Sequence, residues 1–251
     1  MCGRYASSRK PEDLVELFGI AHWEPTEALA EDWNIAPTKP VHAVVQRPLK
    51  GAGPEPVRQL RVLRWGLVPS WAESPDTAVK MINARAETVH EKPAYRRALA
   101  SRRCLLPADG YYEWFTPEGP EAKKRGPKQP YFITPKDGSV AAFAGLFEFW
   151  RDRGKPDGHP DAWWATCAVV TTEAEPELAG IHPRMPLILP PDRWDAWLDP
   201  AIDTAEEARA LLAPPPRGLM EIRPVSPAVG NIRNNGPHLL APVDPSADKL
   251  F

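Results

Sequence analysis

This sequence has no large excess of positive or negative charge, no clustered cysteines and no long apolar run, and each absence excludes a class of protein. With 31 Lys and Arg against 33 Asp and Glu, bulk basicity does not hold the chain to nucleic acid, although a local basic groove fits within a neutral total. The three cysteines are too few for a disulfide framework and show no zinc-like spacing. No apolar run suits a membrane span or secretion signal. We expect a cytoplasmic protein without a metal, cofactor or membrane.

Proline and tryptophan are abundant, with 32 and 10 copies in 251 residues. The prolines are spread along the chain, which indicates stiffened loops and strand ends rather than one disordered linker. Most tryptophans are expected in the core, and a few on the surface would be able to stack on nucleic-acid bases.

The apolar pattern predicts an α+β fold in a single domain, residues 1–251, with no internal repeat and with residues 242–251 as a tail. A largely antiparallel, barrel-like β-sheet core with peripheral helices is expected. The predicted helices lie within residues 8–20, 92–104, 190–200 and 203–213. The predicted strands lie within residues 41–46, 57–69, 103–115, 129–135, 141–150, 163–172 and 220–229. The polar inserts 117–128 and 151–162 are expected to be exposed loops.

The first residues, "MCGRYAS", place a cysteine directly after the initiator methionine. A small second residue favours removal of that methionine, which would leave Cys2 with a free amine beside its thiol. The amine titrates near ~8 and the thiol near ~8.5, so both nucleophiles are partly available at neutral pH. Cys2 is therefore either incidental or the reactive group.

Ten separated stretches, in order along the chain, carry a family resemblance. They read "MCGR", "NIAP", "WGLVPSW", "INARAET", "CLLPADGYYEW", "PYFI", "AGLFE", "VTT", "IHPRMPLIL" and "VGNIRNNGP". Together they resemble the SOS response-associated peptidase (SRAP) family of abasic-site processing proteins, nearly from end to end. The resemblance implies that the N-terminal cysteine captures the aldehyde of an abasic site in single-stranded DNA as a thiazolidine crosslink, within a DNA-damage (SOS) response.

The resemblance also assigns candidate catalytic residues beside Cys2. Glu113 matches a glutamate that moves protons or holds the amine, and Asn83 matches an asparagine that hydrogen-bonds the sugar or the ring. His182 matches a histidine that acts as acid or base on the sugar oxygen and assists reversal of the crosslink. Without the resemblance, Glu113 would be interpreted as a salt-bridged strand residue, Asn83 as a turn or cap residue, and His182 as a loop residue.

Further positions match the family's DNA contacts, and they include three arginines suited to bidentate phosphate binding. These positions are Arg4, Asn34, Pro37, Trp71, Arg85, Thr171 and Arg184. Pairing of the arginines with local acids such as Glu87 is the alternative. The family's second tryptophan, next to Trp71, is replaced here by Ala72, so the wedge against a continuing duplex is expected to be reduced or rebuilt.

The other cysteines, Cys104 and Cys167, lie in apolar stretches and are read as small core residues. We interpret the basic clusters "YRRALASRR" and "AKKRGPK" as solvent-exposed charge. The alternative is that they extend the DNA-binding surface.

Two other functions remain open from sequence. "MCG" also begins class II glutamine amidotransferases, whose N-terminal cysteine attacks an amide, but that family's glutamine-binding stretches are not recognisable here. The second is a non-covalent binder of single-stranded or modified DNA. Self-removal of Met1 and weak abasic-site lyase activity are further expectations for a monomer that becomes nucleoid-associated on damaged DNA.

Overall fold

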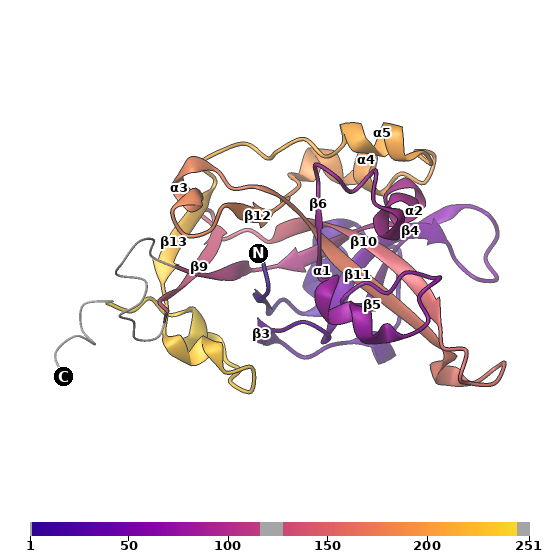
Figure 1. Cartoon of the computed structure of the whole chain (residues 1–251), viewed down its shortest axis with the longest axis horizontal. Coiled ribbons are helices and arrows are strands. Elements are labelled where there is room, and N and C mark those ends of the chain that lie inside the picture. Colours follow the sequence, from indigo (N-terminus) through magenta and orange to yellow (C-terminus); the bar gives the residue numbers. More distant parts are fainter. Residues whose placement is uncertain (1, 116–127, 245–251) are drawn as a thin grey trace.

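Five strands close into a barrel at the centre of the computed structural model, which describes residues 2–115 and 128–244. The barrel strands are β4 (Pro40–Pro48), β5 (Pro56–Trp65), β7 (Arg103–Ala108), β10 (Ala141–Arg151) and β11 (Trp163–Glu173). Four of the pairings, β5–β4, β4–β7, β7–β10 and β10–β11, are antiparallel. A parallel pairing of β11 with β5 closes the ring (Figure 1). The predicted α+β class and largely antiparallel, barrel-like core are confirmed.

A second sheet, of five strands, packs against one end of the barrel. Its order is β13 (Met220–Pro224), β9 (Pro130–Pro135), β8 (Gly110–Trp114), β1 (Tyr5–Ser7) and β3 (Asp32–Ile35). The Tyr5 ring of β1 lies 5.1 Å from the Trp65 ring and 5.8 Å from the Phe143 ring, both in edge contact. These aromatic contacts anchor the start of the chain to the barrel.

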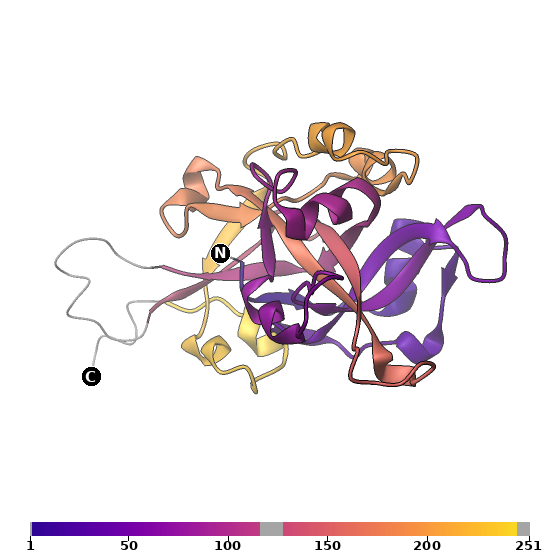
Figure 2. The same ribbon diagram turned by 45° about the vertical axis from the view of Figure 1, so that its right-hand side comes forward.

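Strand register defines the two ends of the barrel. At the first end Pro40 is opposite Arg64, and Ala108 is opposite Ala141. We name it the Cys2 end, because β1, which follows Cys2, pairs with β3 just before β4 and with β8 just after β7. The other end, where Pro48 meets Pro56, is named the Arg47 end. Both views show the β4–β5 hairpin projecting on the side opposite β9 and β13 (Figures 1 and 2).

Three short strands complete the sheets. They are β2 (His22–Trp23), β6 (Asn83–Arg85) and β12 (Arg184–Pro186). Both β6 and β12 pair with the last part of β11, β6 in parallel and β12 antiparallel. Sequence periodicity predicts none of the three, because two or three residues are too few to show alternation.

Prolines begin most of the helical segments in the described residues. The α-helices are α1 (Pro11–Phe18), α2 (Pro93–Ser101), α3 (Pro176–Ala179), α4 (Trp194–Leu198) and α5 (Ala205–Ala210). The 3-10 helices are Pro25–Glu27, Pro75–Lys80, Pro160–Ala162, Pro191–Arg193, Pro227–Gly230 and Pro237–Leu240. Proline suits a first helical position because its fixed φ is helical and its missing N–H has no partner to lose there. The high proline content therefore reflects helix starts as well as loops.

The barrel strands alternate between two cores, as the two-residue period of a strand requires. In β4, Val41, Ala43 and Val45 pack in the cluster that holds Cys2, whereas Val44 packs in the cluster that holds the apolar faces of α1 and α4. Cys104 and Cys167 are buried in the Cys2 cluster, as the sequence predicts.

Part of the sequence lies outside the description. The basic cluster "AKKRGPK" falls almost entirely there, as do residues 245–251 of the predicted tail. At the start of that tail, Val243 donates its N–H to the Pro224 carbonyl at 2.9 Å. Within the described ranges, none of the helices is both long and apolar enough to span a bilayer.

Candidate functional site at the Cys2 end

Cys2 is held by the side chain of Asn83. The Asn83 Nδ2 donates to the Cys2 carbonyl at 2.8 Å. Asn83 is itself fixed, since Trp65 Nε1 donates to the preceding Ile82 carbonyl at 2.9 Å and the Tyr95 hydroxyl donates to the Asn83 carbonyl at 3.1 Å. Two candidate residues that are far apart in sequence are thus brought together.

The amide oxygen of Asn83 is a hydrogen-bond acceptor without a donor in the described residues. This Oδ1 atom is buried. A buried acceptor without a donor is costly in a native protein and is characteristic of binding and catalytic sites. Asn83 therefore presents an acceptor beside Cys2 for an incoming hydroxyl or N–H group.

Glu113 lies close to Cys2 because β8 pairs with β1. Tyr5 is opposite Tyr111 and Ala6 is opposite Gly110. Continued by two residues toward the N-terminus of β1, this antiparallel register places Glu113 beside the start of the chain. Both Cys2 and Glu113 are buried. Burial raises the pKa of the Cys2 thiol, and the negative charge of Glu113 raises it further. The thiol is consequently neutral at physiological pH in this arrangement.

His182 lies between α3 and β12 and is half-buried. Its Nδ1 lies 3.0 Å from the Arg184 backbone nitrogen and 3.2 Å from the Arg184 carbonyl oxygen, so the backbone of Arg184 orients the ring. Because β12 and β6 both pair with β11, the segments that carry His182 and Asn83 reach the same stretch of that strand. No three His, Cys, Asp or Glu side chains in residues 2–115 and 128–244 gather closely enough to hold a metal ion.

Arg184 is paired with an acid. Its Nη1 and Nη2 each donate to one carboxylate oxygen of Glu87 at 2.8 Å, and Nη2 donates to the Thr171 carbonyl at 2.6 Å. Burial alone would raise the pKa of Glu87, but the hydrogen bonds and charge of Arg184 outweigh it and lower that pKa. This is the local pairing considered from the sequence, and a phosphate contact by Arg184 stays a prediction.

Arg4 and Asn34 tie the N-terminal strands to the C-terminal motif "VGNIRNNGP". Arg4 Nη1 donates to the Asn34 Oδ1 and to the Val229 carbonyl, both at 2.7 Å. Burial lowers the pKa of Arg4. The Asn34 Nδ2, fully buried, lies within 3.2 Å of the Val229, Asn231 and Asn234 carbonyls. Both residues hold the fold in this structure, and their predicted DNA contacts are untested.

The remaining predicted DNA contacts differ in accessibility. Arg85 is exposed and Trp71 is 64% exposed, whereas Pro37 is half-buried and Thr171 is fully buried. Arg85 and Trp71 are therefore the members of this set best placed to meet a polymer.

A strained turn next to Pro37 was not anticipated from sequence. Lys39 donates its N–H to the Ala36 carbonyl at 3.3 Å, and between them Thr38 has a φ of 72°. It is the one non-glycine residue with positive φ in the described chain, and a β-branched side chain disfavours that conformation. The Trp65 carbonyl, which accepts the Thr38 N–H at 2.7 Å, helps to hold the turn. Such strain is common at functional sites.

The loop that carries Trp71 is braced by another indole. Trp150 Nε1 donates to the Ala72 carbonyl at 2.7 Å, and Ala72 packs in a small cluster with Val68, Ala78 and Trp150. The Ala72 side chain is buried, while its neighbour Trp71 is exposed. That the wedge is reduced or rebuilt stays an expectation from sequence.

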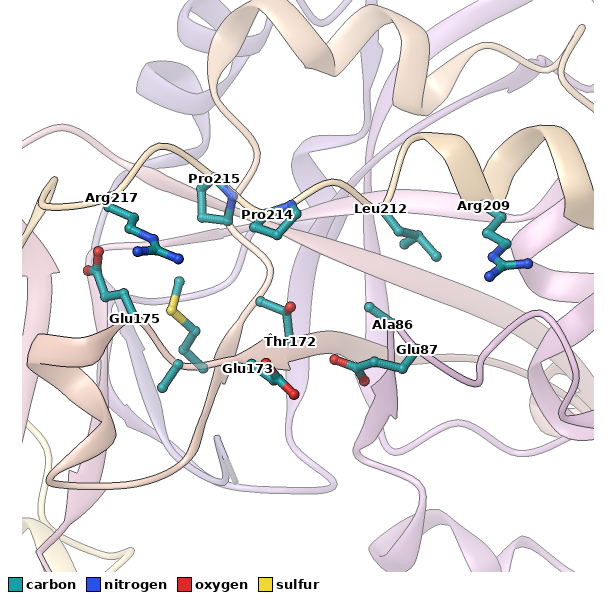
Figure 3. Close-up of a pocket in the computed structure, with 12 residues that line it drawn as sticks. Ala86, Glu87, Thr172, Glu173, Glu175, Arg209, Leu212, Pro214, Pro215 and Arg217 are labelled. Carbon is teal, nitrogen blue, oxygen red and sulfur yellow. The ribbon is translucent and has the colours of Figure 1, made fainter.

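A separate cavity, of about 540 Å³, adjoins the Arg184–Glu87 pair (Figure 3). Glu87 and Thr172 line one side, and Pro214, Pro215 and Arg217 line the other. Neither Cys2 nor Asn83 lines it, so the predicted catalytic residues do not form this cavity.

Comparison with known proteins supports the family resemblance. The family described as SOS response associated peptidase (SRAP) matches residues 1–232. The chain is 36% identical over 242 residues to a protein of Bacillus subtilis named abasic site processing protein YoqW, covering 96% of this chain and 99% of that one. It is 33% identical over 210 residues to abasic site processing protein HMCES of Gallus gallus, covering 74% of this chain and 58% of that one.

A solved structure shares the fold. A crystal structure of a protein from Bacteroides thetaiotaomicron superposes with a TM-score of 0.78 at 25% identity, covering 96% of this chain and all of the other.

Proposed function

Because the chain belongs to the SOS response associated peptidase (SRAP) family, we propose that it processes abasic sites in single-stranded DNA by covalent capture on Cys2. The observation that carries this proposal is the contact between Cys2 and Asn83, with Glu113 alongside. Relatives of nearly equal length that are named abasic site processing proteins add support.

The proposed reaction begins once Met1 has been removed. The Cys2 amine adds to the C1′ aldehyde of the opened sugar, and loss of one water gives a Schiff base. The thiol sulfur then attacks the same carbon, and the thiol proton ends on the nitrogen. The product is a five-membered thiazolidine, and the balance is one aldehyde and one aminothiol giving one thiazolidine and one water. A cysteine within the chain does not react in this way, since its nitrogen is an amide.

The order of steps follows from the product of the first one. Attack by the amine gives the imine carbon on which the sulfur closes. Glu113 accepts the thiol proton as the sulfur closes the ring and passes it to the nitrogen. Asn83 holds the Cys2 backbone through Nδ2 and offers its Oδ1 to the substrate. His182 serves as acid or base at the sugar oxygen and in reversal.

The DNA contacts follow from accessibility. Exposed Arg85 binds a backbone phosphate and exposed Trp71 stacks on a base near the lesion. Phosphate contacts do not read sequence, which suits a protein that must act wherever a base is lost. The protein acts as a cytoplasmic monomer, and self-removal of Met1 and weak strand cleavage through the Schiff base belong to the same proposal.

A denaturing gel tests the covalent step. Protein of verified mature mass is mixed with single-stranded DNA carrying one abasic site, and a stable adduct is expected. Cys2→Ala should form no stable adduct. Cys2→Ser keeps the amine but not the thiol, so its adduct should appear only after borohydride reduction.

Three other results would reject the proposal. Adduct formation by Cys2→Ala equal to that of the parent would exclude the thiazolidine. Hydrolysis of glutamine without any adduct would support the amidotransferase alternative, and binding without any adduct would support the non-covalent binder.

A further inference from the structure

A cluster of guanidinium groups lies at the Arg47 end of the barrel, away from Cys2. The Arg47 guanidinium carbon lies 5.0 Å from the centre of the Phe149 ring, and Arg47 is an exposed residue. A pocket of about 270 Å³ opens here. Its polar lining comes from Gln46, Arg47, Ser101, Arg102 and Arg103. Prolines and the apolar residues Phe147 and Leu198 form the rest.

Two of these arginines have open hydrogen-bond donors. Across residues 2–115 and 128–244, the Arg47 guanidinium makes no hydrogen bond and no ion pair, and it lies against the Phe149 ring. Arg102 reaches the Glu148 carboxylate through Nη1 alone, at 3.0 and 3.1 Å from its two oxygens. Its Nε and Nη2 have no acceptor in the same part of the chain. The pocket is thus lined by donors that its own residues do not use.

The third arginine removes negative potential from the pocket wall. Arg103 donates to the Leu99 and Ala100 carbonyls in the last turn of α2, at 2.8 and 2.6 Å. It also donates to the Trp197 carbonyl at 2.7 Å and the Asp199 carbonyl at 2.6 Å. The carbonyls at a helix C-terminus repel anions. Because Arg103 donates hydrogen bonds to these carbonyls, the C-terminal end of α2 is compatible with an anionic ligand in the pocket.

The acids nearby are already engaged. Glu148 is buried and accepts Arg102 and the Phe149 N–H, the latter at 2.9 Å. The Asp199 carboxylate accepts the Ala201 N–H at 2.8 Å. Partial burial lowers the pKa of Arg47, and the positive charges of Arg61 and Arg102 lower it further. Since Arg61 is neutralised by Glu27 at 2.9 Å, the uncompensated charge is concentrated on Arg47.

We propose that this pocket, the Arg47 pocket, binds a phosphate group, supplied either as free phosphate or by the backbone of a nucleic-acid strand. A phosphate accepts hydrogen bonds from a planar guanidinium through more than one oxygen at once. Contact with the Phe149 ring fixes the orientation of the Arg47 guanidinium. A bound phosphate also relieves the repulsion between Arg47 and Arg102. The site is independent of the Cys2 chemistry.

Thermal unfolding in phosphate and in chloride of matched ionic strength tests the site. The parent should show a higher midpoint in phosphate. Arg47→Gln should lose that shift and should unfold no earlier than the parent in chloride, because one of the repelling charges is gone. Arg153→Gln is the matched control, since it removes one exposed arginine from the β10–β11 loop without lining the pocket. An equal phosphate shift in the parent and in Arg47→Gln would overturn the proposal.

A second arm identifies the source of the phosphate. Binding of a single-stranded oligonucleotide without an abasic site is measured against salt, so that crosslinking plays no part. If the DNA backbone supplies the phosphate, Arg47→Gln should lower the log–log salt slope by about 0.7, the value for one contact on a single strand. If only the phosphate shift depends on Arg47, the ligand is free phosphate. Arg47→Lys, which keeps the charge without the planar fork, should respond less than the parent and more than Arg47→Gln in whichever assay is positive.

Discussion

At the Cys2 end of the barrel, Arg184 and Arg4 have hydrogen-bond acceptors, whereas at the Arg47 end a cation lacks an acceptor within the described residues. Arg184 is bound by Glu87, and Arg4 is bound by Asn34 and a carbonyl. Arg47 has the face of Phe149 instead. At the Cys2 end the positive charges are therefore satisfied within the fold, which suits attack on a neutral aldehyde. The Arg47 end depends on unbalanced charge, which suits an anion.

Arg103→Ala should have the largest effect on stability, and it belongs to the Arg47 end. Arg103 is 5% exposed, and its loss leaves several buried carbonyls without a donor. A loss of about 3–5 kcal/mol in the free energy of unfolding is expected, measured by denaturant titration. Arg153→Gln should lie within about 0.5 kcal/mol of the parent. Equal stability of the two variants would show that the carbonyl cluster does not need Arg103.

Asn83→Ala should have the largest effect at the Cys2 end after loss of the thiol itself. It removes the donor to the Cys2 carbonyl and the proposed acceptor for substrate, so the crosslinking rate should fall by about 10-fold or more. Asn83→Asp, which keeps an acceptor but loses the donor, separates the two contributions. A parent-like rate for Asn83→Ala would remove this side chain from the mechanism.

Thr38→Gly should stabilise the fold by about 1 kcal/mol, because glycine adopts a φ of 72° without strain. If the strained turn shapes the DNA site, oligonucleotide affinity should fall while stability rises. Lower stability in thermal unfolding would show that the turn is not strained.

Glu87→Gln should have the smallest effect on stability, below about 1 kcal/mol, because the carboxylate is partly exposed. Because Arg184 lowers the Glu87 pKa in the folded state, the pair contributes stability above the ordinary glutamate pKa of about 4.3. That contribution disappears as pH falls through the lower folded-state pKa. Unfolding midpoints between about pH 3 and pH 7 should converge for parent and variant at the acid end.

The same Glu87→Gln variant shows whether Arg184 meets DNA. Freed from the carboxylate, Arg184 should bind single-stranded DNA more tightly if it contacts phosphate. Unchanged affinity would assign Arg184 to positioning Thr171 and β12 alone.

The long elements were predictable from the sequence, and the strands of two or three residues were not. The predicted strand within 141–150 is β10, recognisable as a long apolar run, and the predicted helix within 8–20 contains α1, whose apolar residues recur at helical spacing. Asn83 and Arg184 lie on three-residue strands that exist only because β11 offers both edges to them. Motif resemblance located those residues, but not the strands that carry them.

The sequence by itself determined the α+β class, the residues of the SRAP motifs and the cysteine at position two, because these depend on local pattern and residue identity. Only the tertiary structure decided which groups meet. It set Asn83 against Cys2, gave Arg184 to Glu87, strained Thr38 and left Arg47 without an anion. Contacts between residues tens of positions apart depend on strand pairing and packing, which single-sequence periodicity does not encode.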